Sequence, residues 1–365
     1  MKLTVTQENL SRALQTVSRV ASSKTSLPIL GNILLRTDEN RLLLAATNLE
    51  IAVTEYIGGS IKQPGSFTVP ARLMSDFITS LPASNVTLEL QGSILHVSSG
   101  GYSSKINGMQ ADEFPALPEI TSVYECALAA KEFKRSIQQV VVVASHDDTR
   151  PVLTGVYWHT HEGGLYIAGT DGYRLAEKKL IAKAADQDIS AIIPATALQE
   201  VVRVMTDDIE NVNVLLDDNQ VRFGIGDIEI TSKLIDGNFP DYRQLIPSES
   251  EISVKLAKDD FARITKVASL FARESGGGVT IAADSDTGKV SIHSIASQLG
   301  ENTSEAEAEI SGDGKVTLNS RYLIEALSCL DGSPVTFAFS GKLAPCVLSA
   351  KDAEDYKHII MPLNS

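Results

Sequence analysis

The chain has few of the residues that build disulfide frameworks, metal sites or membrane spans. Its three cysteines, Cys126, Cys329 and Cys346, show no paired spacing, which favours reduced thiols packed as small apolar residues over disulfides or a zinc site. No apolar run approaches the roughly 20 residues that a membrane-spanning helix needs. The first residues, MKLTVTQENL, contain no signal-peptide apolar core. We therefore expect a cytoplasmic protein with no membrane partner.

Recognisable catalytic motifs are also missing. The sequence has no GxSxG and no HExxH pattern. His159 and His161 have metal-ligand spacing, but two glycines follow directly, which is typical of a strand that enters a hairpin turn. Residues 276–278, Gly-Gly-Gly, lack the Lys-Ser/Thr pair of a phosphate loop. We expect no metal, no cofactor and no catalytic residue.

Positive charge is scarce overall, and the net charge of −14 argues against a nucleic-acid partner. The distribution weakens that argument. Residues 7–24, 131–143 and 258–274 each carry a small excess of Lys and Arg over Asp and Glu, so the remainder is more acidic still. One such helix is usually an ordinary solvated face, but the same bias occurs three times.

The three basic stretches belong to an internal repeat. Each reads as a short strand, a polar turn and a helix with apolar residues at closely similar offsets, and their first anchors are spaced by 123 and 128 residues. So long a period implies three tandem domains rather than a solenoid. We expect domains at 1–121, 122–248 and 249–365. The predicted buried positions of these first helices are Leu10, Leu14 and Val17, then Phe133, Ile137 and Val140, then Phe261, Ile264 and Ala268.

A second helix recurs in each copy. Pro70, Pro194 and Asn319 mark its start and are spaced by 124 and 125 residues, and a helix tolerates Pro at its beginning because the missing N–H has no partner there. For the first of these helices we expect a buried stripe made by Leu73, Phe77 and Leu81.

Strand hairpins and two similar linkers complete the pattern. The linkers, 112–118 and 238–247, both contain Phe-Pro, and the acidic stretch 301–309 reads as a strand edge or loop. Two helices and about two small antiparallel sheets in each copy predict an α+β fold.

Taken together, these segments resemble one family along the whole chain. TSLPILGNILL, TNLEIAV, FTVPARL, GTDGYRLA, SKLIDGNFPDYRQLIP and YKHIIMPL occur in the order found in the bacterial DNA polymerase III beta subunits, the sliding clamps. The resemblance implies three tandem clamp domains, joined head to tail with those of a second subunit into a homodimeric ring around duplex DNA. Such a ring confers processivity on the replicative polymerase in DNA replication and has no catalytic activity.

The resemblance also implies a DNA-binding face that does not read sequence. Lys24, Arg72 and Arg150 are the expected DNA contacts. Weaker candidates, chosen only by their positions on the first helices, are Arg12, Arg19, Lys134 and Arg263.

Family partners dock a short apolar peptide motif, which implies a pocket on this chain. Gln244 and the MPLNS end depart from the family pattern. These departures concern which peptide motif the pocket prefers and leave the pocket itself intact. The implied partners are the polymerase III catalytic subunit, a clamp loader and other proteins with a clamp-binding motif. The implied pocket residues are Leu153, Thr170, Gly172, Tyr173, Arg174, Leu175, Pro240, Leu245, Asn319, Tyr322, Ile360, Met361 and Pro362.

For the dimer interface, the family pairs an edge strand with a helix end. The corresponding residues are Lys105 and Ile106 on one side and Leu270 and Phe271 on the other. We expect the acidic stretch 301–309 to face Lys105 or Arg72 across that joint.

Two other functions fit parts of the sequence. One is a hydrolase that uses Asp171 and Arg174, and the other is a triplicated peptide-binding scaffold that never touches DNA.

Overall fold

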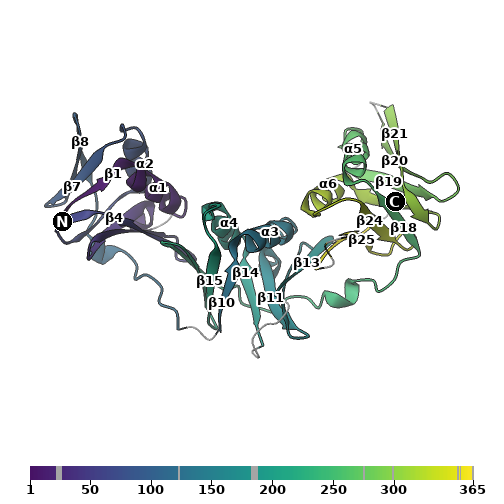
Figure 1. The fold of residues 1–365 in the computed structure, drawn as a ribbon, viewed down its shortest axis with the longest axis horizontal. Helices are drawn as coiled ribbons and strands as arrows, with labels where there is room; N and C mark the ends of the chain where they lie inside the picture. Colours follow the sequence, from purple (N-terminus) through teal and green to yellow (C-terminus); the bar gives the residue numbers. More distant parts are fainter. Residues whose placement is uncertain are drawn as a thin grey trace. The chain divides into compact units, whose positions relative to one another are not determined.

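The computed structural model describes residues 1–21, 27–121, 124–181, 188–273, 276–297, 300–351, 353 and 355–363 (Figure 1). Within these residues the chain forms two compact units. One contains Met1–Phe133 and Ala197–Leu234, and the other contains Lys134–Thr196 and Ile235–Ser365. Each unit is built on two antiparallel sheets. Of the helices described, none is long and apolar enough to cross a membrane.

The first unit joins a five-stranded and an eight-stranded sheet, in the orders β5-β1-β7-β8-β9 and β10-β15-β16-β17-β4-β3-β2-β6. The first sheet ends at β9, whose outer edge has no neighbour in the described structure. The elements are β1 (Lys2–Thr6), α1 (Gln7–Ser18), η1 (Pro28–Gly31), β2 (Asn32–Asp38), β3 (Arg41–Thr47), β4 (Ile51–Gly58), β5 (Ser60–Gln63), β6 (Ser66–Pro70), α2 (Ala71–Thr79), β7 (Asn85–Gln91), β8 (Ile94–Ser99), β9 (Tyr102–Asn107), η2 (Ala111–Glu113), β10 (Tyr124–Ala129), α4 (Ala195–Val204), β15 (Asn211–Leu216), β16 (Gln220–Ile225) and β17 (Ile228–Lys233).

The second unit joins a nine-stranded and a four-stranded sheet, in the orders β14-β11-β12-β13-β26-β25-β24-β18-β22 and β21-β20-β19-β23. The elements are α3 (Ala130–Val141), η3 (Pro151–Thr154), β11 (Gly155–His161), β12 (Gly164–Thr170), β13 (Arg174–Ile181), β14 (Ser190–Pro194), η4 (Arg243–Leu245), β18 (Ile252–Leu256), α5 (Lys258–Ser269), β19 (Gly278–Asp284), β20 (Lys289–Ala296), β21 (Gly300–Glu307), β22 (Glu309–Ser311), β23 (Gly314–Asn319), α6 (Ser320–Cys329), β24 (Val335–Phe339), β25 (Cys346–Ala350) and β26 (Tyr356–Ile360). The division between the units falls inside α3 and α4, which begin in one unit and continue in the other.

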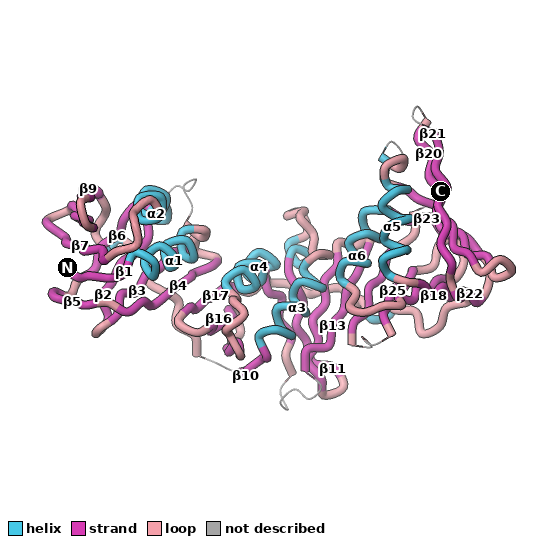
Figure 2. Tube along the Cα trace, turned by 45° about the horizontal axis from the view of Figure 1, so that its top comes forward, coloured by secondary structure: helices cyan, strands magenta, loops and turns pink. Residues whose placement is uncertain are grey.

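The three first helices, α1, α3 and α5, have the predicted amphipathic frame. All nine predicted positions, from Leu10 to Ala268, are buried, so the repeat read from the sequence is confirmed at the level of packing. Figure 2 shows α1 beside α2, and α5 beside α6. Each helix of such a pair buries one stripe and leaves its opposite face polar, as the spacing of its apolar residues requires.

The second helices start where the sequence predicts, because α2, α4 and α6 each begin directly after Pro70, Pro194 and Asn319. The predicted stripe of α2 is wrong at Leu73 and Phe77, whereas Leu81 is buried as predicted. Leu73 is exposed and Phe77 only half-buried, whereas Met74 and Ile78 are fully buried. The helix is rotated by one position from the predicted frame, because its buried i, i+4 pair begins one residue later.

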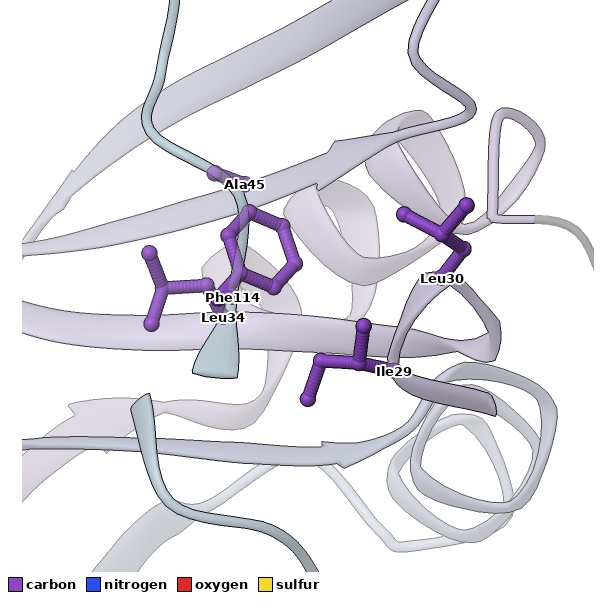
Figure 3. Packing of buried hydrophobic residues seen from close by; sticks show 5 residues of the cluster. All are labelled: Ile29, Leu30, Leu34, Ala45 and Phe114. Carbon is purple, nitrogen blue, oxygen red and sulfur yellow. The ribbon is translucent and has the colours of Figure 1, made fainter. Parts of the chain in front are cut away.

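Each Phe-Pro linker is held on a sheet by its aromatic side chain. In the first, Phe114 packs with Leu34 and Ala45 of the sheet and with Ile29 and Leu30 of η1 (Figure 3). In the second, Phe239 and Tyr242 pack on a cluster that contains Ala168, Leu175 and Ile359. The linkers are therefore packed on sheets, and each also contacts the domain that follows it: Ile359 lies in the cluster of the second linker, and Arg222 donates to the Pro118 carbonyl of the first at 2.7 Å.

Candidate functional sites

A tight turn between β12 and β13 lies at the centre of the predicted pocket. We call Thr170–Arg174 the site turn. The Thr170 hydroxyl donates to the Arg174 carbonyl at 2.6 Å and accepts from the Gly172 N–H at 3.0 Å. The Asp171 carboxylate accepts from the N–H groups of Tyr173 and Arg174 at 2.9 and 3.1 Å. Gly172 has a backbone φ of +93°, which residues with a Cβ atom rarely adopt.

The first copy contains the same turn built from different residues. The Thr47 hydroxyl donates to the Ile51 carbonyl at 2.9 Å and accepts from the Leu49 N–H at 3.0 Å. The Asn48 side chain accepts from the N–H groups of Glu50 and Ile51 at 3.0 and 2.8 Å. The two turns thus share their hydrogen bonds, but the first has Ile51 where the site turn has an arginine. The internal repeat extends to single hydrogen bonds in these two copies, and of the two turns only the second carries a charged group at this position.

Arg174 connects the site turn to two helices. Its side chain is 7% exposed, its Nε donates to Asp171 Oδ2 at 3.0 Å, and its Nη2 donates to the Val142 carbonyl at 2.8 Å. Its Nη1 is paired with Glu325, and its guanidinium lies 4.4 Å from the ring centroid of Tyr322, both on α6. A buried guanidinium is stable only when its donors are paired, and here every branch has a partner.

The Glu325 carboxylate is shared between two arginines. One is Arg174, and the other is the exposed Arg321, whose Nε donates to Glu325 Oε1 at 2.8 Å. Burial raises the pKa of Glu325, but the hydrogen bonds from Arg321 and Arg174 outweigh it and hold that pKa below its usual range. The carboxylate therefore stays ionised and fixes Arg174 against α6.

Apolar side chains continue the surface from the site turn. Leu175 is buried in a cluster with Tyr242, and the N–H of Leu245 donates to the Tyr242 carbonyl at 2.9 Å. Leu245 itself is half exposed, as is Tyr173 to a larger degree, and Pro240 is also exposed. These exposed apolar side chains are available to a partner, whereas Leu175 supports them from below.

The end of the chain borders the same turn. In β26, Ile360 is fully buried and pairs in register with Arg174 of β13. The Met361 N–H donates to the Tyr173 carbonyl at 2.8 Å, and Met361 and Pro362 are half-buried. The structure therefore brings Ile360 and Met361 against the site turn.

Three further predicted residues have structural roles near this surface. Leu153 is buried in η3, and its carbonyl accepts from the Ser145 N–H at 2.8 Å. Asn319 caps α6 by accepting from the Arg321 N–H at 2.9 Å. Arg150 Nη2 donates to the Asp171 carbonyl at 3.3 Å, which attaches a predicted DNA contact to the site turn.

Sequence reasoning missed the partners that hold Arg174. Glu325 follows Tyr322 by three residues on the same face of α6, which is the one signal that a helical spacing offers. Val142 contributes only its carbonyl, so no residue type marks it.

The two histidines with metal-ligand spacing have separate environments. His159 is buried with its Nε2 2.7 Å from the Tyr242 hydroxyl, and burial lowers its pKa. His161 is part-exposed and lies beside Glu162 at 3.7 Å. Within the described ranges, no group of three or more His, Cys, Asp and Glu side chains is arranged to hold a metal ion.

The predicted DNA contacts differ in how free their side chains are. Lys24 lies outside the described residues. Arg72 on α2 is 96% exposed, and its Nε lies 3.8 Å from Asp76 Oδ2, which is too long for a hydrogen bond. Its guanidinium is therefore open to solvent. Arg263 is exposed but paired with Asp260 at 2.8 Å. Arg135, which contributes to the basic excess of residues 131–143, is bound to Asp331 and to the Cys329 carbonyl. That helix is therefore less basic on its free surface than its sequence suggests.

The predicted interface residues lie at a sheet edge and a helix end. Lys105 and Ile106 belong to the edge strand β9, where Lys105 is exposed and Ile106 is buried in its own sheet. At the end of α5, Leu270 is 53% exposed and Phe271 is half-buried. The acidic stretch forms the edge strand β21 and the short strand β22, as expected for a strand edge. The backbone groups of β9 and β21 are thus available for pairing.

Comparison with known proteins assigns the whole chain. Three models of the DNA polymerase III beta subunit match, for the N-terminal domain at residues 1–118, the central domain at 127–241 and the C-terminal domain at 243–364. The chain is 31% identical to a beta sliding clamp of Staphylococcus epidermidis over 376 aligned positions that cover all of both proteins.

Solved structures agree with this assignment to the DNA polymerase III beta subunits. A DNA polymerase sliding clamp from Bacillus subtilis superposes with a TM-score of 0.96 at 28% identity, covering 100% of this chain and 99% of that one. The DNA polymerase III beta subunit from Pseudomonas aeruginosa gives 0.95 at 26% identity, with all of both chains covered. The three clamp domains of helices and antiparallel sheets are thus confirmed. The chain belongs to the family of bacterial DNA polymerase III beta subunits, the non-catalytic DNA sliding clamps.

Proposed function

We propose that this sliding clamp closes as a head-to-tail pair of subunits in which β9 of one subunit pairs with β21 of the other. Both strands end their sheets, so each has unpaired N–H and C=O groups. Lys105 on β9 would face the exposed Glu301, Glu305 and Glu307 of β21. Leu270, at the end of α5, would be covered in the same joint.

The three domains of each subunit are proposed to run from 1 to 121, 122 to 248 and 249 to 365. The family models end within a few residues of these limits, which supports them. The DNA-facing surface in this proposal contains Lys24, Arg72 and Arg150, whose charges attract phosphates without reading bases. The site of action is the cytoplasm.

The surface around Arg174 is proposed as the docking site for partner peptides. Its exposed Tyr173 and Leu245 supply apolar contacts, and Arg174, whose donors are paired within the protein, fixes the turn that carries Tyr173. The partners are the polymerase III catalytic subunit, a clamp loader and other proteins with an apolar clamp-binding motif.

The observation that carries this reading is that, of the two such turns found among the described residues, only one contains an arginine, Arg174, held by Asp171, Glu325 and Tyr322. An arginine whose donors are all paired inside the protein holds the turn in one position before a peptide binds, so it is a positioning residue rather than a surface charge.

The hydrolase alternative loses its main candidate at this point. Both Asp171 oxygens are occupied, one by two backbone N–H groups and the other by Arg174. A carboxylate used in this way holds a turn and is poorly placed to move protons.

Primer extension on a primed single-stranded circle tests the proposal. With a cognate loader and polymerase, the parent clamp should lengthen the products of each binding event, and Arg174→Ala should abolish the lengthening, because the polymerase and the loader both dock on this surface in the proposal. Short products with the parent clamp, or long products with the variant, would contradict it.

A further inference from the structure

A separate pocket lies in the first unit, between α1, the end of α4 and the β16–β17 hairpin. Its volume is about 460 Å³, which is in the range of small-molecule sites. Three arginines, Arg12, Arg19 and Arg203, line it. None of its residues belongs to the surface around the site turn.

One buried carboxylate lines this pocket and lacks a full set of partners. Glu55 of β4 is 2% exposed, and its Oε2 accepts no hydrogen bond from any residue that the structure describes. Its Oε1 lies 3.5 Å from Arg12 Nε, which is too long for a strong hydrogen bond. Burial raises the pKa of Glu55, against opposing contributions from Thr16 and Arg12. A buried polar atom left unpaired in this way indicates an absent partner.

Arg12 is free to change its position. Its side chain is 67% exposed, in contrast to the carboxylate that it approaches. If Arg12 turned towards an anion in the pocket, the Glu55 carboxylate would become accessible to a donor on the same ligand.

The rest of the lining is mixed: Gln15, Thr16, Thr206, Asp208 and Asp227 are polar, and Arg203 is itself ion-paired to Glu200. Aliphatic side chains lie beside these groups. Val204, Ile209 and Ile228 are half-buried there, so they present aliphatic surface beside the arginines. A bare phosphate needs no such surface, but the sugar and base of a nucleotide do.

We propose that this pocket binds a single nucleotide unit, with its phosphate on Arg12, Arg19 and Arg203 and its base against the aliphatic side chains. Guanidinium groups suit phosphate because they form paired, charge-assisted hydrogen bonds. The Glu55 carboxylate accepts a hydrogen bond from a base amino group, as acidic side chains do with cytosine. The ligand is either a free nucleotide or one nucleotide of single-stranded DNA. Only the second source rests on the proposed function.

Saturation-transfer NMR on the unloaded protein tests this site with deoxycytidine monophosphate as the probe. We expect transfer to base and sugar protons, and tighter binding than for deoxyribose phosphate or inorganic phosphate. Arg203→Ala should weaken binding about tenfold, which is the loss of one charge-assisted contact. Glu55→Ala should remove the tighter binding of deoxycytidine monophosphate relative to deoxyribose phosphate. Glu55→Gln, which keeps shape and a hydrogen-bond acceptor, guards against a folding defect and should retain part of that advantage.

Arg36→Ala is the matched control, because Arg36 is exposed on β2 in the same unit and does not line the pocket. Competition by a short single-stranded oligonucleotide would identify DNA as the source, and its failure with the mononucleotide still bound would identify a free nucleotide. Equal affinity for deoxycytidine monophosphate and inorganic phosphate, no transfer at all, or an unchanged Arg203→Ala variant would overturn the proposal. Since no loader is used, these results are independent of ring formation.

Discussion

The Arg174 guanidinium lies 4.4 Å from the ring centroid of Tyr322, and the same side chain is ion-paired to Asp171 and Glu325. One residue of β13 therefore connects a turn and a helix that are about 150 residues apart in sequence. A peptide that docks on this surface meets groups whose positions are already fixed, so less ordering is required on binding.

Replacing Arg174 should therefore affect both stability and partner binding. Arg174→Ala leaves buried acceptors without a donor and should lower the free energy of unfolding by about 3 kcal/mol. Denaturant titration measures this. Arg321→Ala is the control, since it also removes a partner of Glu325 but from an exposed pair, and should cost about 1 kcal/mol or less. Equal losses for the two variants would show that Arg174 is no better held than a surface charge.

Gly172 should not accept a side chain. Its φ is +93°, and a Cβ there would lie 3.3 Å from Arg150 Nη1. Gly172→Ala should therefore destabilise the protein by about 1 kcal/mol or more and displace Arg150. Gly101→Ala serves as the control, because a Cβ at Gly101 meets nothing within 4 Å. If denaturation midpoints of the two variants coincide, the site turn is not constrained as described.

Acid should destabilise the second unit through a buried histidine. His358 is fully buried with Nδ1 2.8 Å from the Tyr356 hydroxyl, and burial, aided by the Arg174 charge, lowers its pKa to about 3 from 6.5. Between these values the unfolded chain binds the proton and the folded chain does not. The neutral histidine's contribution is thus intact above pH 6.5 and is lost as pH falls, by up to about 1.4 kcal/mol per pH unit.

His358→Phe should flatten that pH dependence, measured by the free energy of unfolding from neutral to acidic pH. His146→Gln is the control, since His146 is exposed. A slope that persists unchanged in His358→Phe would assign the acid sensitivity to other groups.

The end of α5 should be part of the subunit joint. Leu270→Ala combined with Phe271→Ala removes apolar side chains whose exposure to water would be unfavourable on a monomer. Light scattering should show a shift from dimer to monomer. Leu343→Ala, at another exposed leucine of the same unit, should leave the dimer intact. An unchanged dimer in the double variant would remove these residues from the interface.

Arg72 should contribute one phosphate contact. Arg72→Ala should reduce the salt dependence of duplex binding by about one unit of slope, with little effect of sequence. Fluorescence anisotropy measures this, and Arg36→Ala is expected to match the parent protein. A slope unchanged by Arg72→Ala would place that side chain away from the DNA.

The elements that the sequence predicts well are those with local signals. The first helices follow from apolar spacing, and the second helices from Pro70, Pro194 and Asn319. The stripe on α2 was displaced by one residue, because Leu73 and Met74 both fit an apolar pattern and only packing against the sheet distinguishes them.

The elements that it predicts poorly depend on contacts between distant segments. Arg135 counts as a basic residue in the sequence, but Asp331 neutralises it from 196 positions away. For Glu325 the only local signal is its place three residues after Tyr322, and nothing in the sequence indicates that it binds Arg174, 151 positions away. Burial of Glu55 is not predicted either, because glutamate is rarely buried, although strand alternation places it on the same face as Val53 and Ile57.

Retention on DNA tests the central claim most directly. The protein is loaded onto circular duplex DNA by a cognate clamp loader, unbound protein is removed, and the circle is then cut once. A ring held by topology should remain on the intact circle and be lost when the DNA is linearised. Protein that stays bound after cutting, or never becomes resistant to dissociation on the circle, would contradict the account of this chain as a sliding ring.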